Sequence, residues 1–151
     1  MVELNIDNNG DEFEYYEEFN EILKNLTRIF NINKLVVVDV TIVNNHEIQI
    51  LNKKYRGKDY PTDILSFDFG DKKLYNDLPI FPLGELIISK EKVESQAKDF
   101  NHSLKREYCY LFAHGLIHLM GYDHENESER IEMNKLVDDI FVPLGITREY
   151  E

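Results

Sequence analysis

The residues best suited to chemistry are three histidines in the segment HGLIHLMGYDH, residues 114–124. The chain contains only five histidines, so three of them in one short segment form a distinct cluster. His114 and His118 are four residues apart in sequence that favours a helix. Both imidazoles therefore leave the same helix face, one turn apart. Two neutral imidazoles placed in this way can bind one metal ion.

Gly121 explains how a third histidine could reach the same ion. It follows His118 by three residues, where glycine can adopt the left-handed conformation that ends a helix. The chain can then turn back and bring His124 to the ion from another direction. Three nitrogen ligands leave a fourth position open for water, which is typical of catalytic zinc sites and not of structural ones. We therefore predict a metal site formed by His114, His118 and His124.

The same spacing, HxxxHxxGxxH, occurs in a large class of zinc peptidases. In those enzymes a glutamate follows the first histidine and acts as the general base. Here that position is Gly115. The ligand pattern is present without the peptidase base, which argues against a protease. The two other histidines, His46 and His102, have no such neighbours and are assigned no role.

The elements that must position the cluster can be predicted from hydrophobic patterning. We expect strands at 4–6, 34–43, 64–69 and 83–89. We expect helices around 13–30, from Asn44 or Asn45 to about 55, in two segments between about 90 and 120 capped near Asn101 or Ser103, and around 133–144. This mixture predicts a single α+β domain over residues 1–151, with a small mixed sheet of about four strands packed against about five helices. A polar loop at 70–82 predicts one hairpin, and the strand order stays open.

Composition narrows the class of protein. The chain has 151 residues, a net charge of −12 and one cysteine, Cys109. The sequence shows no apolar run of transmembrane length and no secretory signal, so we expect a cytoplasmic protein without a membrane partner. Cys109 lies in an apolar helical stretch, which favours a buried, unreactive thiol. The acidic charge argues against a general nucleic-acid coat protein, but the run at 52–58 carries a local group of basic residues.

Three segments together resemble the YbeY family of bacterial metal-dependent endoribonucleases. They are AHGLIHLMGYDH (113–124), YRGKDYPTDILSF (55–67) and LGELIIS (83–89), and they occur in the family's order and spacing. The resemblance implies one zinc ion per chain, held by the three histidines. It also implies hydrolysis of single-stranded RNA, with roles in ribosomal RNA maturation at the 3′ end of the small-subunit RNA and in ribosome quality control. The partners that it implies are ribosomal RNA and proteins of the small ribosomal subunit.

The resemblance assigns a role to Arg56, the arginine of the YR element. A guanidinium near the metal can hold the oxygens of a phosphodiester with two parallel hydrogen bonds. Weaker contacts to backbone phosphates are predicted for Lys53, Lys54 and Lys58, although solvated surface cations are the simpler interpretation of these lysines. The oligomeric state is not predicted.

The general base stays unassigned. Asp123 could orient an imidazole or accept the proton of the attacking water, or it could only accept a hydrogen bond in the turn after Gly121. Asp63 and Ser66 could line the cleft, but a turn cap and a strand position are the simpler interpretations.

Two positions depart from the family pattern. Glu85 replaces the usual aspartate, and Asp68 replaces the usual proline after LSF. A further carboxylate near an RNA cleft would repel phosphate. The alternatives to an endoribonuclease are a zinc peptidase or other metallohydrolase, and a ribosome-assembly factor with a structural metal.

Overall fold

The computed structural model describes residues 1–70 and 72–146. The strands in this part are β1 (Val2–Asp7), β2 (Leu35–Val43), β3 (Ile64–Phe67) and β4 (Ile80–Ser89). The α-helices are α1 (Tyr16–Ile29), α2 (Asn45–Arg56), α3 (Lys90–Asp99), α4 (Leu104–Leu119) and α5 (Glu127–Phe141). Two 3₁₀ turns lie at Lys72–Tyr75 and Val142–Leu144. The predicted α+β fold is confirmed.

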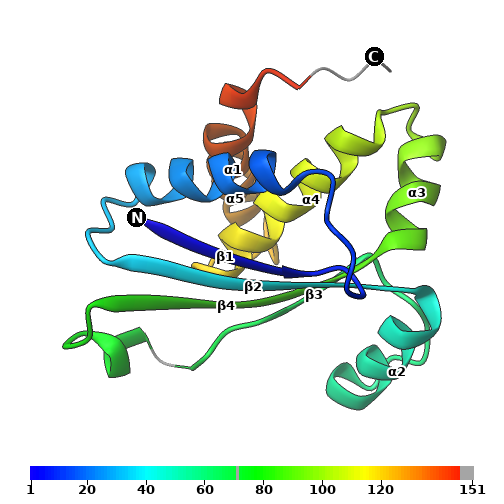
Figure 1. Cartoon of the computed structure of the whole chain (residues 1–151), viewed down its shortest axis with the longest axis horizontal. Helices are drawn as coiled ribbons and strands as arrows, with labels where there is room; N and C mark the ends of the chain where they lie inside the picture. Colours follow the sequence, from blue (N-terminus) through cyan, green and yellow to red (C-terminus); the bar gives the residue numbers. More distant parts are fainter. Residues whose placement is uncertain (71, 147–151) are drawn as a thin grey trace.

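The strands form one mixed sheet in the order β1-β2-β4-β3. Strands β1, β2 and β4 are parallel, while β3 pairs with β4 in the antiparallel direction at the edge (Figure 1). The β3–β4 pair is the hairpin that the loop at 70–82 predicted. The order itself depends on long-range packing, which hydrophobic periodicity does not report.

The helices divide unequally between the two faces of the sheet. Helices α1, α4 and α5 cover one face, and α2 lies against the other (Figure 1). The main core lies under the three helices, where Phe19 of α1 stacks on Phe112 of α4 with ring centroids 4.0 Å apart. A second, smaller cluster of Ile48, Leu65 and Ile87 lies under α2.

Strand β2 shows the effect of this unequal cover. Its residues alternate between buried and half-buried along the whole strand. The inward positions pack under α1, α4 and α5, whereas the outward positions belong to a face that α2 covers only in part. The side of β2 that faces α2 therefore keeps some contact with solvent.

Several element boundaries also differ from those expected. Strand β1 is longer than predicted, β3 ends at Phe67, and Leu144 lies in a 3₁₀ turn after α5. Strand β4 starts at Ile80, within the predicted loop, and includes Pro82. Proline is tolerated there because the pairing of β4 with β3 begins only at Glu85, and because Pro82 lies next to a bulge in the pairing with β2.

Side-chain caps fix the helices that border the site. The Asn44 side chain accepts a hydrogen bond from the Glu47 backbone N–H at 2.8 Å, so Asn44 caps α2. Ser103 accepts from the Arg106 N–H at 3.1 Å and caps α4. Gly57 ends α2 in the left-handed conformation, with φ of 70°, which leaves Arg56 as the last helical residue.

Two expectations from composition can be compared with the structure. Cys109 is fully buried in α4, and burial raises the pKa of its thiol, so the unreactive protonated form is favoured. Among the described helices, none combines the length and the apolar character needed to cross a bilayer.

Candidate metal centre

Helix α4 carries His114 and His118 on the face that borders the edge strand β3. Its opposite side is buried in the main core, which holds the helix firmly in place. Gly115 allows a close approach to the sheet, because a Cβ atom there would lie 2.9 Å from both the Ile64 Cδ1 and the Leu86 Cδ2 atoms. The two imidazoles therefore project from a rigid platform, one helical turn apart.

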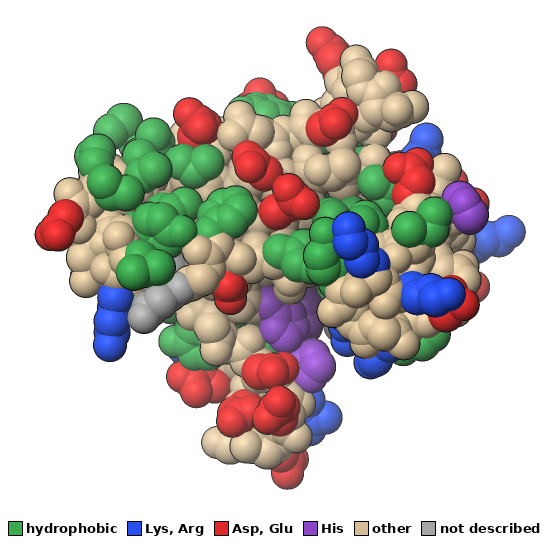
Figure 2. Space-filling model, turned by 90° about the horizontal axis from the view of Figure 1, so that it is seen from below, with side chains coloured by type: hydrophobic (Ala, Val, Ile, Leu, Met, Phe, Trp, Pro, Cys, Tyr) green, Lys and Arg blue, Asp and Glu red, His purple; other side chains and the backbone are tan. Residues whose placement is uncertain are grey.

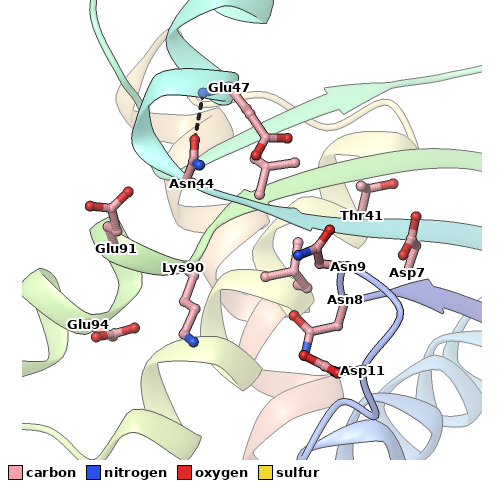
Figure 3. Close-up of a pocket in the computed structure, with 12 residues that line it drawn as sticks. Asp7, Asn8, Asn9, Asp11, Thr41, Asn44, Glu47, Lys90, Glu91 and Glu94 are labelled. Carbon is pink, nitrogen blue, oxygen red and sulfur yellow. Dashed lines mark hydrogen bonds between the residues drawn. The ribbon is translucent and has the colours of Figure 1, made fainter.

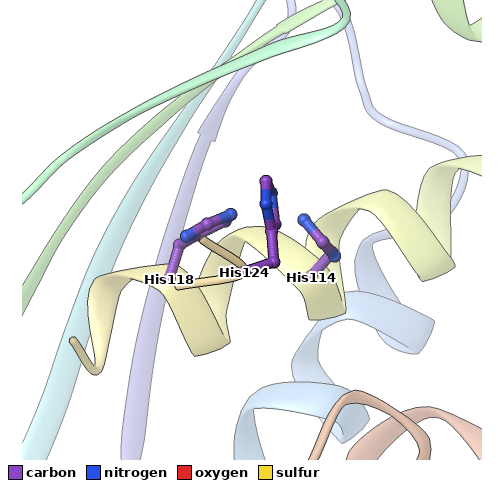
Figure 4. Close-up of side chains that lie close together, drawn as sticks. All are labelled: His114, His118 and His124. Carbon is purple, nitrogen blue, oxygen red and sulfur yellow. The ribbon is translucent and has the colours of Figure 1, made fainter. Parts of the chain in front are cut away.

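A Schellman turn after α4 brings in the third histidine. The Gly121 N–H donates to the His118 carbonyl at 2.9 Å, and the Tyr122 N–H donates to the Ile117 carbonyl at 3.3 Å. Gly121 has φ of 100°, as the sequence predicted for a left-handed helix end. The chain then reverses direction, so His124 approaches the other two histidines from outside the helix (Figure 4).

The three imidazoles converge on one point. One ring nitrogen of each histidine lies within 4.8 Å of those of the other two, and the ring centroids are separated by 4.8–5.8 Å. An ion that binds each nitrogen at about 2.0–2.1 Å requires nitrogens within about 4 Å of one another, so small side-chain rotations are enough. Among the described residues this histidine group could hold a metal ion.

The protonation states fit this role. The His118 Nδ1 atom lies 3.0 Å from the Tyr122 carbonyl oxygen, so Nδ1 carries the proton and Nε2 keeps a free lone pair. Burial, followed by the proximity of His118 and His124, lowers the pKa of the His114 imidazole to about 4. Burial also lowers the pKa of His118. Neutral imidazoles are the form that binds a metal ion, so the donor set fits zinc.

The histidines line a cleft of about 720 Å³ between α4, β3 and the end of α2. Arg56 lines the same cleft from α2, so the structure brings it to the predicted centre. In Figure 2 the histidines lie at the middle of the visible face, with basic side chains to the right, where α2 lies. Acidic side chains lie below and to the left of the histidines.

Comparisons with known proteins identify the family. The family model described as Endoribonuclease YbeY matches residues 3–145. The chain belongs to the YbeY family. It is 50% identical to Endoribonuclease YbeY of Mycoplasmopsis synoviae, with 96% of this chain and 94% of the relative covered. It is 37% identical to that of Alkaliphilus oremlandii, with 97% of this chain and all of the relative covered.

A solved structure supports the fold of this YbeY-family chain. The solution structure of a Thermotoga maritima protein superposes with a TM-score of 0.61 at 27% sequence identity. The alignment covers 96% of this chain and 92% of the other. The similarity therefore extends over the sheet and the helices, and is not limited to the histidine segment.

The three predicted lysines lie outside the YbeY-family cleft. Lys53 and Lys54 line a separate hollow on the outer side of α2, and Lys53 pairs with Asp59 at 3.7 Å. Lys58 is exposed in the loop after α2. These lysines can thus contact phosphates only if a bound RNA strand leaves the cleft and continues over α2.

Asp123, Asp63 and Ser66 all line the cleft. Asp123 is exposed, and its carboxylate accepts the His124 backbone N–H at 2.8 Å, which is the turn hydrogen bond considered from the sequence. The Asp63 carboxylate accepts the Ile64 N–H at 2.8 Å and so stabilises the start of β3. These contacts explain the local structure, and a proton-transfer role for Asp123 stays a prediction.

The two departures from the family pattern lie outside the lining of the cleft. Glu85 lies on the open face of the sheet, and burial followed by the charge of Asp39 on β2 raises its pKa. Asp68 is exposed and accepts the Gly70 N–H at 3.1 Å. Neither carboxylate lines the cleft, but Glu85 is the cross-strand partner of Phe67, which does.

A second hollow, of about 460 Å³, lies at the carboxyl ends of β1 and β2 (Figure 3). Its charged lining comprises Asp7, Asp11, Glu47, Lys90, Glu91 and Glu94. Five carboxylates against one ammonium repel a phosphodiester, and the lining contains no histidine. This hollow is therefore poorly suited to binding a nucleic-acid phosphate.

Sequence reasoning missed two aromatic residues in the cleft. Tyr55, at the end of α2, and Phe67, at the end of β3, both line it, and their ring centroids are 5.2 Å apart. Phe67 gave no separate signal, because an aromatic residue in a strand usually indicates core packing. The position of Tyr55 next to Arg56 was the one available clue.

Proposed function

We propose that this chain is a zinc-dependent endoribonuclease that cleaves single-stranded RNA. Its proposed substrate is ribosomal RNA, in maturation of the 3′ end of the small-subunit RNA and in ribosome quality control. One zinc ion per chain, action in the cytoplasm and contacts with small-subunit proteins are parts of the same proposal. Membership of a family named for endoribonuclease activity supports the reaction class.

One observation carries the proposal: the three converging histidines and Arg56 line the same cleft. A zinc ion in such a site is a Lewis acid that provides a nucleophile at neutral pH by lowering the pKa of water to about 7. A phosphodiester gathers negative charge on its non-bridging oxygens when it is attacked. A cation beside the histidines stabilises this charge.

Different residues of the chain have separate roles in the proposed cleavage reaction. Arg56 donates hydrogen bonds to the non-bridging oxygens, for which the planar guanidinium is better suited than an ammonium. Asp123 is exposed beside His124 and can accept a proton from the attacking group. Lys53, Lys54 and Lys58 contact phosphates of the strand beyond the cleft. The Tyr122 carbonyl keeps the His118 ring in one orientation.

The peptidase alternative is weakened by the packing around Gly115. The space in which a side chain would start at this position is occupied by Ile64 and Leu86. A glutamate general base at this position would have to displace both side chains. No described contact favours a peptide substrate over a phosphodiester.

The test is cleavage of a precursor of small-subunit ribosomal RNA by purified protein, with and without a chelator. We expect cleavage by the zinc-loaded wild type and none after chelation. His118→Ala should abolish cleavage, and Arg56→Lys should lower kcat by about 10–150-fold, because one hydrogen bond to a charged group contributes about 1.5–3 kcal/mol. Arg130→Lys, on the exposed surface of α5, is the matched control. Equal cleavage by wild type and His118→Ala would reveal a contaminating nuclease and end the proposal.

A further inference from the structure

The cleft contains a large aromatic side chain that the chemistry described above does not use. Tyr55 is 57% exposed although its ring is apolar. It precedes Arg56 on α2, and both line the cleft that contains the histidines. Tyr60, in the loop after α2, is similarly exposed at 52% but does not belong to that lining.

The Tyr55 ring is held in a defined orientation. Phe67 of β3 packs against it in an edge-to-face arrangement, with the ring planes at 67°. Phe67 in turn packs on the small cluster of Ile48, Leu65 and Ile87. A ring supported in this way loses little conformational freedom when it binds a ligand, which favours recognition by stacking.

The Tyr55 ring is also open to an incoming group. The Lys54 ammonium lies 5.2 Å from its centroid. Lys54 is exposed and has a flexible stem, so a flat ligand can displace it.

We propose that Tyr55 is a stacking platform for one unpaired base of the RNA, next to the phosphate that Arg56 holds. This inference rests on the proposed function and deepens it, because it names the residue that selects single strands. An aromatic ring can stack on a base that is free of its neighbours. A base inside a duplex has both faces covered by adjacent base pairs. Tyr55 therefore binds an unpaired nucleotide at the site of cleavage more tightly than a paired one.

The first experiment separates binding from chemistry. Tyr55→Ala should raise KM for a ten-nucleotide single-stranded RNA by about 5–150-fold, because stacking on one base contributes about 1–3 kcal/mol. It should leave kcat within about twofold, while Tyr55→Phe should match the wild type. Tyr60→Ala is the control. The same RNA with an abasic nucleotide at the stacked position should bind wild type and Tyr55→Ala equally weakly. Unchanged KM in Tyr55→Ala would overturn the inference.

The second experiment detects stacking directly and does not depend on activity. The chain contains no tryptophan, so a Tyr55→Trp variant carries a single indole. Single-stranded RNA should quench its fluorescence when mixed with the zinc-loaded protein in a stopped-flow instrument, before cleavage proceeds. The same RNA as a duplex should quench it much less, and Tyr60→Trp should respond to neither.

The outcomes distinguish this inference from the proposed function. If the wild type cleaves RNA but the Tyr55→Trp emission is unchanged, or is quenched equally by duplex, the stacking platform is wrong and the endoribonuclease stands. If the wild type neither binds nor cleaves RNA, both fall. Melting temperatures of all variants identify any loss of folding, and Tyr55→Phe then supplies the comparison that does not disturb the ring.

Discussion

The Nδ1 atom of His118 lies 3.0 Å from the carbonyl oxygen of Tyr122. The turn that brings in His124 therefore also fixes the orientation of His118. Two ligands of the proposed ion depend on one short piece of backbone. The integrity of this turn matters as much to the metal centre as the identity of the histidines.

Metal content is the most direct test of the histidine centre. We expect about one zinc ion per chain in the wild type and almost none in His114→Ala, His118→Ala or His124→Ala, because two imidazoles hold an ion much less tightly than three. His46→Ala removes an exposed histidine of α2 and should keep the ion. Mass spectrometry measures the zinc content of each purified variant. An ion retained by all three variants would contradict the centre.

The turn can be tested by changing Gly121. A side chain at φ of 100° is strained, so Gly121→Ala should lower stability by about 1–2 kcal/mol and weaken zinc binding. Gly145 also has a positive φ, 69°, but lies after α5, so Gly145→Ala should cost similar stability and leave zinc affinity unchanged. Thermal melting and a zinc titration measure both effects. Equal zinc affinities of the wild type and Gly121→Ala would show that the turn does not position His124.

The packing at Gly115 predicts the result of restoring the peptidase pattern. Gly115→Glu should destabilise the protein by about 2 kcal/mol or more, because the new side chain must displace Ile64 and Leu86. It should not create peptidase activity. Gly115→Ala, which adds only one methyl group against flexible side-chain ends, should cost less. Casein turnover by Gly115→Glu that disappears on chelation would refute this argument.

Removal of the metal separates a catalytic ion from a structural one. His124 is exposed, and the main core includes none of the three ligands. Chelation should therefore lower the melting temperature by about 2–12 °C, the effect of about 1–3 kcal/mol in a domain of this size, and leave the far-UV circular dichroism unchanged. Unfolding on chelation would favour an assembly factor with a structural metal.

The lowered pKa of His114 predicts how the metal-free protein responds to acid. The unfolded chain binds a proton at this side chain near pH 6.5, whereas the folded chain does so only near pH 4. Between these values the unfolded state binds more protons, so stability falls as the pH falls. When the pH is lowered from 7.5 to 5.0, the melting temperature of the metal-free protein should drop more for the wild type than for His114→Asn. His46→Asn should behave like the wild type, and parallel curves for all three would contradict the assignment.

The histidine centre was predictable because its signals are local. The spacing of His114 and His118 and the glycine after them fix one helix turn and its end, which short-range geometry determines. A cap for α2 at Asn44 or Asn45 was predictable for the same reason, and the structure shows Asn44 in this role. Strand order, the inclusion of Pro82 in β4 and the half-exposed side of β2 depend on neighbours distant in sequence. The same holds for Tyr55 and Phe67, which meet only because the β3–β4 hairpin lies beside α2.

The two helices that border the cleft differ in how much hydrophobic core they pack against. Helix α4 belongs to the main core, whereas α2 rests on the small cluster of Ile48, Leu65 and Ile87. Backbone amides of α2 should therefore exchange with deuterium sooner than those of α4, since fewer buried contacts oppose their local opening. A long substrate could then enter by a brief outward movement of the wall that carries Arg56, while the histidine wall stays in place.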